Sequence, residues 1–144
     1  MAHSSAVGLR VLSLVMGAFL VFMGLGKLGW FTDSSFLVAE LRGWWGGAPA
    51  LSRWYIDTVA MPGAPLFARL VPLGELAAGA ALVAGYQARL AAAVALLMIL
   101  NFHFAMGILF QWAYLGNGFG LPVVGGLSAL AIGARRLPFS VSLR

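Results

Sequence analysis

Two apolar runs separated by a short polar turn decide the fold, and together they read PLFARLVPLGELAAGAALVAGYQARLAAAVALLMILNFHFAMGILF over residues 65–110. An α-helix rises about 1.5 Å per residue, so about 20 residues cross a hydrocarbon layer of roughly 30 Å. Each run is long enough to do so, and Pro65 suits the first turn of a helix. We therefore expect membrane-spanning helices over residues 65–85 and 90–110, joined by a turn at residues 86–89.

The composition of the whole chain excludes a water-soluble domain. Apolar residues form 62% of the 144 residues, charged residues form 9%, and the mean hydropathy is +0.95. Ordinary globular domains hold about 25% charged residues, so too few charges remain here to cover a water-facing surface. The net charge of +5 does not indicate a nucleic-acid partner, because the basic residues lie at the ends of apolar runs and not on one polar face.

Two further apolar runs flank the central pair, at residues 9–29 and at residues 116–133. The last run contains Pro122 and several glycines, but both residue types are more frequent in membrane helices than in soluble ones. The expected fold is all-α: an integral membrane bundle of four transmembrane helices that forms a single domain over residues 1–144.

Residues 31–64, between the first two spans, are too many for a simple connection and too apolar for a flexible linker. Apolar side chains recur at helical spacing over residues 34–45, which predicts a helix lying at the membrane surface. A Gly-Gly-Ala-Pro stretch breaks this helix. A second short helix is expected over residues 52–59. We call residues 31–64 the interfacial segment.

The charge distribution predicts the orientation of the bundle. If the spans alternate, the two termini and the turn at residues 86–89 share one side, which carries no acid. The basic residues on that side are Arg10, Arg89, Arg135, Arg136 and Arg144. The opposite side carries acids, four basic residues and all five tryptophans. Positive charge near helix ends is retained in the cytoplasm, so both termini are expected to be cytoplasmic.

Glu75 is the most informative position, because a carboxylate in hydrocarbon is costly and usually faces the bundle interior with a partner. The candidate partners are Lys27, Arg69 and His103. Arg69 lies six residues before Glu75, so a regular helix does not bring the two together unless Pro72 bends it. Two interpretations stay open: a Glu75 that is paired or neutral and fixes helix packing, or a ligand or proton site.

His103 is the second candidate for chemistry. It lies two residues after Asn101 on the third span, so the two side chains point in nearly opposite directions and do not easily line one narrow pocket. His103 either makes an interhelical hydrogen bond or donates to, or accepts a proton from, a bound carbonyl compound. A metal or haem site is not expected, because no second metal-ligating side chain stands beside it in a span.

The chain lacks several common site motifs. It has no Cys, which excludes disulfides and thiolate metal sites. No strand precedes its glycines, as a nucleotide-binding loop requires, so we expect them to permit close helix packing. The glycines concerned are Gly17, Gly24, Gly74 and Gly79.

Three short motifs stand in the spans: Gly24-Leu-Gly-Lys27 ends the first, Pro72-Leu-Gly-Glu75 lies in the second, and Arg89 opens the Ala-rich third. Together they resemble the DoxX/DoxD family over most of the chain. The resemblance implies a small four-helix protein of the prokaryotic cytoplasmic (inner) membrane. DoxD-like members form the membrane subunit of thiosulfate:quinone oxidoreductase. Lys27, Glu75 and Arg89 match the family pattern, and the lack of Cys counts against the related dithiol carriers.

We expect this bundle to bind a quinone, or a similar apolar carbonyl compound, near its outer half as part of an electron-transfer assembly. Glu75 and His103 are the candidate catalytic residues, which would move protons. Cations would hold the quinone oxygens and aromatic side chains would cover the ring. The candidate binding residues are Lys27, Arg69, Trp45 and Trp54.

The alternative is a non-catalytic accessory subunit of a larger respiratory or photosynthetic membrane complex. Large aromatic side chains that a monomer rarely leaves uncovered outside lipid favour this interpretation. A small transporter is a weaker possibility, because no inverted repeat is visible. The expected partners are membrane lipids and other membrane protein subunits, and any electrons must arrive through such a subunit.

Overall fold

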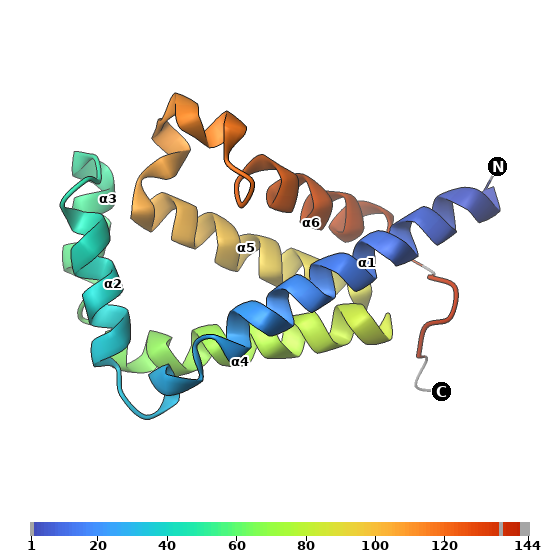
Figure 1. Cartoon of the computed structure of the whole chain (residues 1–144), viewed down its shortest axis with the longest axis horizontal. Helices are drawn as coiled ribbons and strands as arrows, with labels where there is room; N and C mark the ends of the chain where they lie inside the picture. Colours follow the sequence, from blue (N-terminus) through green and yellow to red (C-terminus); the bar gives the residue numbers. More distant parts are fainter. Residues whose placement is uncertain (1, 136, 142–144) are drawn as a thin grey trace.

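The bundle is built from four helices that run back and forth: α1 (Ala2–Leu25), α4 (Ala64–Ala84), α5 (Ala88–Met106) and α6 (Leu121–Gly133). The structure, a computed structural model, describes residues 2–135 and 137–141. Figure 1 shows the interfacial segment gathered at one end of the bundle, while the start of α1 and the end of α6 lie at the opposite end. We call these the capped end and the arginine end.

Three helices of the described chain are long and apolar enough to cross a membrane: residues Ala6–Leu25 of α1, then α4, then α5. The fourth, α6, has 13 residues, which at about 1.5 Å each fall short of a roughly 30 Å layer. The predicted number of four full spans is therefore not met. Pro122 lies in the first turn of α6, where its missing N–H breaks no helical hydrogen bond. Asn117, which precedes this helix, has an extended backbone.

The third span also ends earlier than predicted. Gly107 adopts a left-handed φ of +74° and stops α5 four residues before Phe110. A Cβ at this position would lie 2.3 Å from Cδ of Pro49, so only glycine fits. Short 3₁₀ turns follow at η3 (Ile108–Phe110) and η4 (Trp112–Gly116).

The interfacial segment contains α2 (Ser35–Trp45), which matches the helix predicted over residues 34–45. The second predicted helix is divided into α3 (Ala50–Tyr55) and a turn of π-helix, η2 (Ile56–Ala60). A 3₁₀ turn, η1 (Leu28–Phe31), joins α1 to the segment. The segment is fixed to the end of α5, because the Ser52 hydroxyl donates to the Phe104 carbonyl oxygen at 2.6 Å.

The close packing predicted for small residues is confirmed where α1 meets α4. A Cβ on Gly17 would lie 2.8 Å from the Gly79 carbonyl oxygen. A Cβ on Gly79 would likewise lie 2.8 Å from the Gly17 carbonyl oxygen. Membrane helices associate chiefly through van der Waals contact and interhelical hydrogen bonds, so this contact of backbones is stabilising. Nearby, the buried Ser13 hydroxyl donates to the Leu82 carbonyl oxygen at 2.6 Å.

Candidate functional site

A cavity of about 460 Å³ lies at the capped end, between α1, α4 and α5 and beneath the interfacial segment. Its wall carries few polar side chains, and those are Lys27, Glu40, Glu75, His103 and Asn117. The other lining residues are apolar, and half of them are aromatic: Phe19, Trp30, Trp44, Phe102 and Phe119. An apolar wall with a few convergent polar groups is typical of a site for a small molecule. We call it the capped cavity.

Glu75 and Lys27 form an ion pair on the wall of this cavity. The Lys27 ammonium lies 2.9 Å from each carboxylate oxygen of Glu75 and donates to the Met23 carbonyl oxygen at 3.1 Å. Three acceptors match the three N–H groups of an ammonium, so this pairing uses every donor of Lys27. Glu75 is 2% exposed, and the partner expected for a carboxylate in hydrocarbon is confirmed as Lys27.

Local structure explains how the two groups meet. After α1 ends, the Lys27 N–H donates to the Gly24 carbonyl oxygen, and this turn brings the side chain back over Met23. A Cβ on Gly24 would lie 2.7 Å from Cγ of Leu76, the residue after Glu75. The Gly-Leu-Gly-Lys motif therefore serves two purposes: it lets α1 approach α4 closely, and it turns the chain so that Lys27 reaches the carboxylate.

His103 reaches the same cavity from α5. Its Nδ1 lies 3.0 Å from the Tyr114 hydroxyl in η4, and the two rings meet edge to face. Its Nε2 makes no hydrogen bond within residues 2–135 and 137–141. No fully buried side-chain nitrogen or oxygen in those residues lacks a partner, so Nε2 keeps some exposed surface, and His103 lines the cavity. Burial raises the pKa of the Tyr114 hydroxyl above its ordinary value.

Asn101 faces away from this cavity, as its two-residue offset from His103 predicts. Its Oδ1 accepts a hydrogen bond from the Tyr55 hydroxyl at 2.6 Å, which ties α5 to the interfacial segment. Asn101 therefore bonds to the interfacial segment, whereas His103 lines the cavity.

Three predicted binding residues lie elsewhere. The Arg69 guanidinium donates to the Pro65 carbonyl oxygen on its own helix. Trp45 donates from Nε1 to an Asp57 carboxylate oxygen at 3.1 Å, and the Trp54 side chain is 56% exposed. None of the three lines the capped cavity.

Trp30 and Trp44 line the cavity instead, and sequence reasoning missed both. A signal for Trp44 was present in its helix angle: at about 100° per residue it lies about 20° from the buried Leu37, whereas Trp45 lies about 80° from it. Tyr114 was also missed. It follows a left-handed turn and an irregular segment, where no periodicity indicates which way a side chain points.

The arrangement supports binding and proton movement. The ion pair places an ionisable carboxylate against an apolar space, and His103 offers one ring nitrogen to the same space. Within the described ranges, no three His, Asp or Glu side chains lie close enough together to hold a metal ion.

Comparison with known proteins places the chain in a family. No curated protein and no solved structure matches it significantly. The sequence model of the DoxX family matches residues 8–108, a range that includes Lys27, Glu75 and His103 but not Tyr114. Because this match covers more than half of the chain, and three helices are long and apolar enough to span a bilayer, the protein is a membrane protein that belongs to the DoxX family.

Proposed function

We propose that the capped cavity binds a quinone or a similar apolar carbonyl compound, and that the protein is the quinone-linked membrane subunit of an electron-transfer assembly. One observation carries the proposal: a Lys27–Glu75 ion pair and an imidazole with one free nitrogen share a single aromatic-walled cavity. The volume of about 460 Å³ lies in the range of small-molecule sites, roughly 300–1,000 Å³.

Binding of a flat ring is assigned to the aromatic wall and to His103. Trp44 and Phe102 already meet edge to face with ring centroids 6.1 Å apart, and both line the cavity. Because the Lys27 ammonium has no donor left, Nε2 of His103 is the group that donates to a carbonyl oxygen. Asn117 supplies a second donor, since its Oδ1 accepts from the Phe119 N–H and its amide N–H groups remain free.

Glu75 is assigned the proton chemistry. A bound quinone takes up two electrons and two protons on reduction. Lys27 holds the Glu75 carboxylate in a fixed orientation at the cavity wall, where it exchanges protons with the bound compound or with His103. The electrons are delivered by a partner subunit.

The test measures binding of a short-chain ubiquinone analogue to the protein in lipid nanodiscs. We expect His103→Ala to weaken binding about tenfold, the equivalent of one hydrogen bond of about 1.4 kcal/mol. Leu97→Ala, at an exposed position of the same helix that does not line the cavity, is the matched control and leaves affinity unchanged. Equal affinity in the wild type and in His103→Ala would refute the proposal.

Glu75 needs a variant that preserves folding, because Glu75→Gln leaves the partly buried Lys27 ammonium without a counter-ion. The double variant Lys27→Met/Glu75→Gln removes both charges and keeps an apolar wall. We expect this protein to bind the analogue but to lose quinone-linked electron flux in membranes. Unchanged flux would remove Glu75 from the mechanism.

A non-catalytic accessory subunit is the second candidate, and exposed aromatic side chains favour it. Trp112 is 89% exposed and Trp54 is 56% exposed, both at the capped end of the bundle. Gentle detergent extraction distinguishes the two roles. Co-purification with larger redox subunits in a fixed ratio, together with normal electron flux in the Lys27→Met/Glu75→Gln protein, would assign the accessory role.

We also propose the prokaryotic inner membrane as the location, with the arginine end in the cytoplasm. The charge asymmetry and the shared end of α1 and α6 support this orientation. Because the chain has no Cys, single cysteines report topology directly. A membrane-impermeant maleimide should label Thr32→Cys in intact spheroplasts, whereas Ser140→Cys should react only after lysis.

A further inference from the structure

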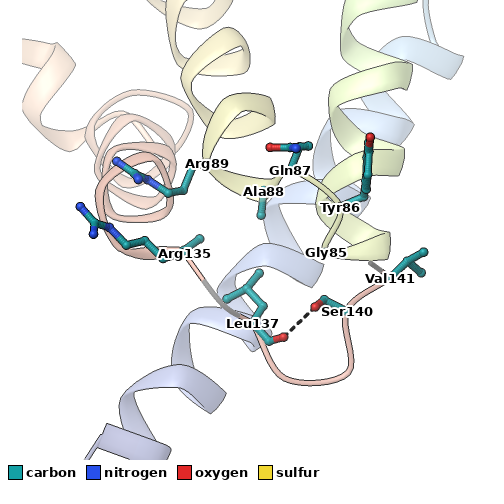
Figure 2. A pocket seen from close by; sticks show the side chains of 10 residues that line it. Gly85, Tyr86, Gln87, Ala88, Arg89, Arg135, Leu137, Ser140 and Val141 are labelled. Carbon is teal, nitrogen blue, oxygen red and sulfur yellow. Dashed lines mark hydrogen bonds between the residues drawn. The ribbon is translucent and has the colours of Figure 1, made fainter. Parts of the chain in front are cut away.

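A second cavity, of about 350 Å³, lies at the arginine end, between the turn that joins α4 to α5 and the chain that follows α6. Figure 2 shows this cavity, which we call the arginine cavity. Gly85 ends α4 with a φ of +72°, and the Val141 N–H donates to the Ala84 carbonyl oxygen at 3.0 Å. The Ser140 hydroxyl donates to the Leu137 carbonyl oxygen at 2.8 Å. The chain after α6 is therefore joined to the end of α4 by one hydrogen bond and is closed on itself by another.

Two arginines line this cavity with most of their donors free. Arg89 comes from the first turn of α5, and its Nε donates to the Ala131 carbonyl oxygen at 3.0 Å. A guanidinium has five N–H donors, so four remain on Arg89. Arg135 follows α6, and its side chain makes no hydrogen bond within the part of the chain that the structure describes. Both guanidinium groups lie on the same side of the cavity, next to α6.

Neither arginine faces an acidic side chain. The four Asp and Glu residues of the chain all belong to the interfacial segment or to the capped cavity, and they are Asp33, Glu40, Asp57 and Glu75. A third arginine at this end, Arg10, is occupied differently, because it donates to the Leu82 and Val83 carbonyl oxygens at the end of α4. Within the described residues no acidic side chain neutralises these two arginines, so both guanidinium groups are available to an anion.

We propose that the arginine cavity binds the phosphate group of an anionic phospholipid. Guanidinium groups recognise phosphate oxygens by paired hydrogen bonds, and basic pockets between membrane helices bind anionic head groups. Adjacent apolar side chains favour a lipid over free phosphate: Leu90, next to Arg89, is 62% exposed, and Ile132 on α6 is 75% exposed. These side chains give acyl chains a surface beside the head group. This proposal is independent of the chemistry at the capped end.

The test compares phosphatidylglycerol with phosphatidylcholine of identical acyl chains, using native mass spectrometry of the full chain in mild detergent. Each arginine near a membrane surface contributes about 1 kcal/mol, so we expect Arg89→Gln/Arg135→Gln to lower the preference for phosphatidylglycerol about 25-fold. Arg42→Gln/Arg53→Gln in the interfacial segment removes the same charge and should leave the preference intact. Equal losses in both double variants would overturn the proposal.

Two further arms keep the result decisive. Arg135→Gln alone removes no hydrogen bond within the described chain, so it tests the site even if the double variant folds poorly, with an expected loss of about fivefold. Millimolar inorganic phosphate should not displace the lipid. Displacement by phosphate, or no preference for phosphatidylglycerol in the wild type, would overturn the assignment to a lipid.

Discussion

The two ends of the bundle treat charge in opposite ways. At the capped end, the Glu75 carboxylate is buried and meets Lys27 at 2.9 Å, so the chain supplies its own counter-ion. At the arginine end, Arg89 and Arg135 stand beside an open cavity that no acidic side chain lines. Within hydrocarbon a charge needs a partner from the protein, whereas near lipid head groups the partner can come from the membrane. The following predictions test this contrast.

The largest effect is expected from removing one member of the internal pair. Lys27→Met leaves the Glu75 carboxylate buried without a counter-ion and should lower the free energy of unfolding by about 3–5 kcal/mol. Lys27→Met/Glu75→Gln should recover much of that loss, because no unpaired charge remains. Thermal denaturation in detergent measures both, with Arg135→Gln as the control from the other end. If the double variant is no more stable than Lys27→Met, the buried Glu75 carboxylate does not need Lys27 as its counter-ion.

A smaller effect is expected from alanine substitution of Gly85 and Gly107, which end α4 and α5 with a left-handed φ. The two variants should differ in melting temperature. Alanine at either position costs about 1–2 kcal/mol of backbone strain. At Gly107 the added Cβ would also lie 2.3 Å from the Pro49 ring, within the fixed interfacial segment, which adds roughly 1–3 kcal/mol. At Gly85 it would meet Cβ of Ser140 at 2.6 Å, in an exposed loop that a single backbone hydrogen bond joins to α4, so relief requires a smaller rearrangement. Gly107→Ala should therefore melt at a lower temperature than Gly85→Ala, and the reverse order would disprove this account.

The smallest effect concerns alkaline pH at the capped end. Burial raises the pKa of Tyr114 in the folded protein, so the unfolded chain ionises first as the pH rises through about 10. Stability from this group is complete below that pH and falls above it. Tyr114→Phe should lower the melting temperature at neutral pH, because Nδ1 of His103 loses its partner, but should flatten the decline between about pH 9 and 11. The same alkaline slope in both proteins would argue against a shifted Tyr114.

Hydropathy and helical spacing were sufficient to predict the helical class, the two central spans and the helix α2. They also indicated that Glu75 has an internal partner, because the cost of a charge in hydrocarbon does not depend on fold detail. The length of α6 was overestimated, because the apolar composition begins at residue 116 whereas the helix begins only at Leu121, after an extended Asn117. Residue type alone pointed to Trp45 and Trp54, whereas the tryptophan of α2 that lines the cavity is Trp44, whose helix angle is closer to that of the buried Leu37.

The crossing of Gly17 and Gly79 has a mechanical consequence. Lys27 lies ten residues beyond Gly17, about 15 Å further along a helix of that length. If α1 and α4 were held further apart at this crossing, the distance between them would also increase where Lys27 meets Glu75. A methyl group added to either glycine would draw the ammonium and the carboxylate apart without touching them. The precision of the charged pair thus depends on two residues that have no side chain.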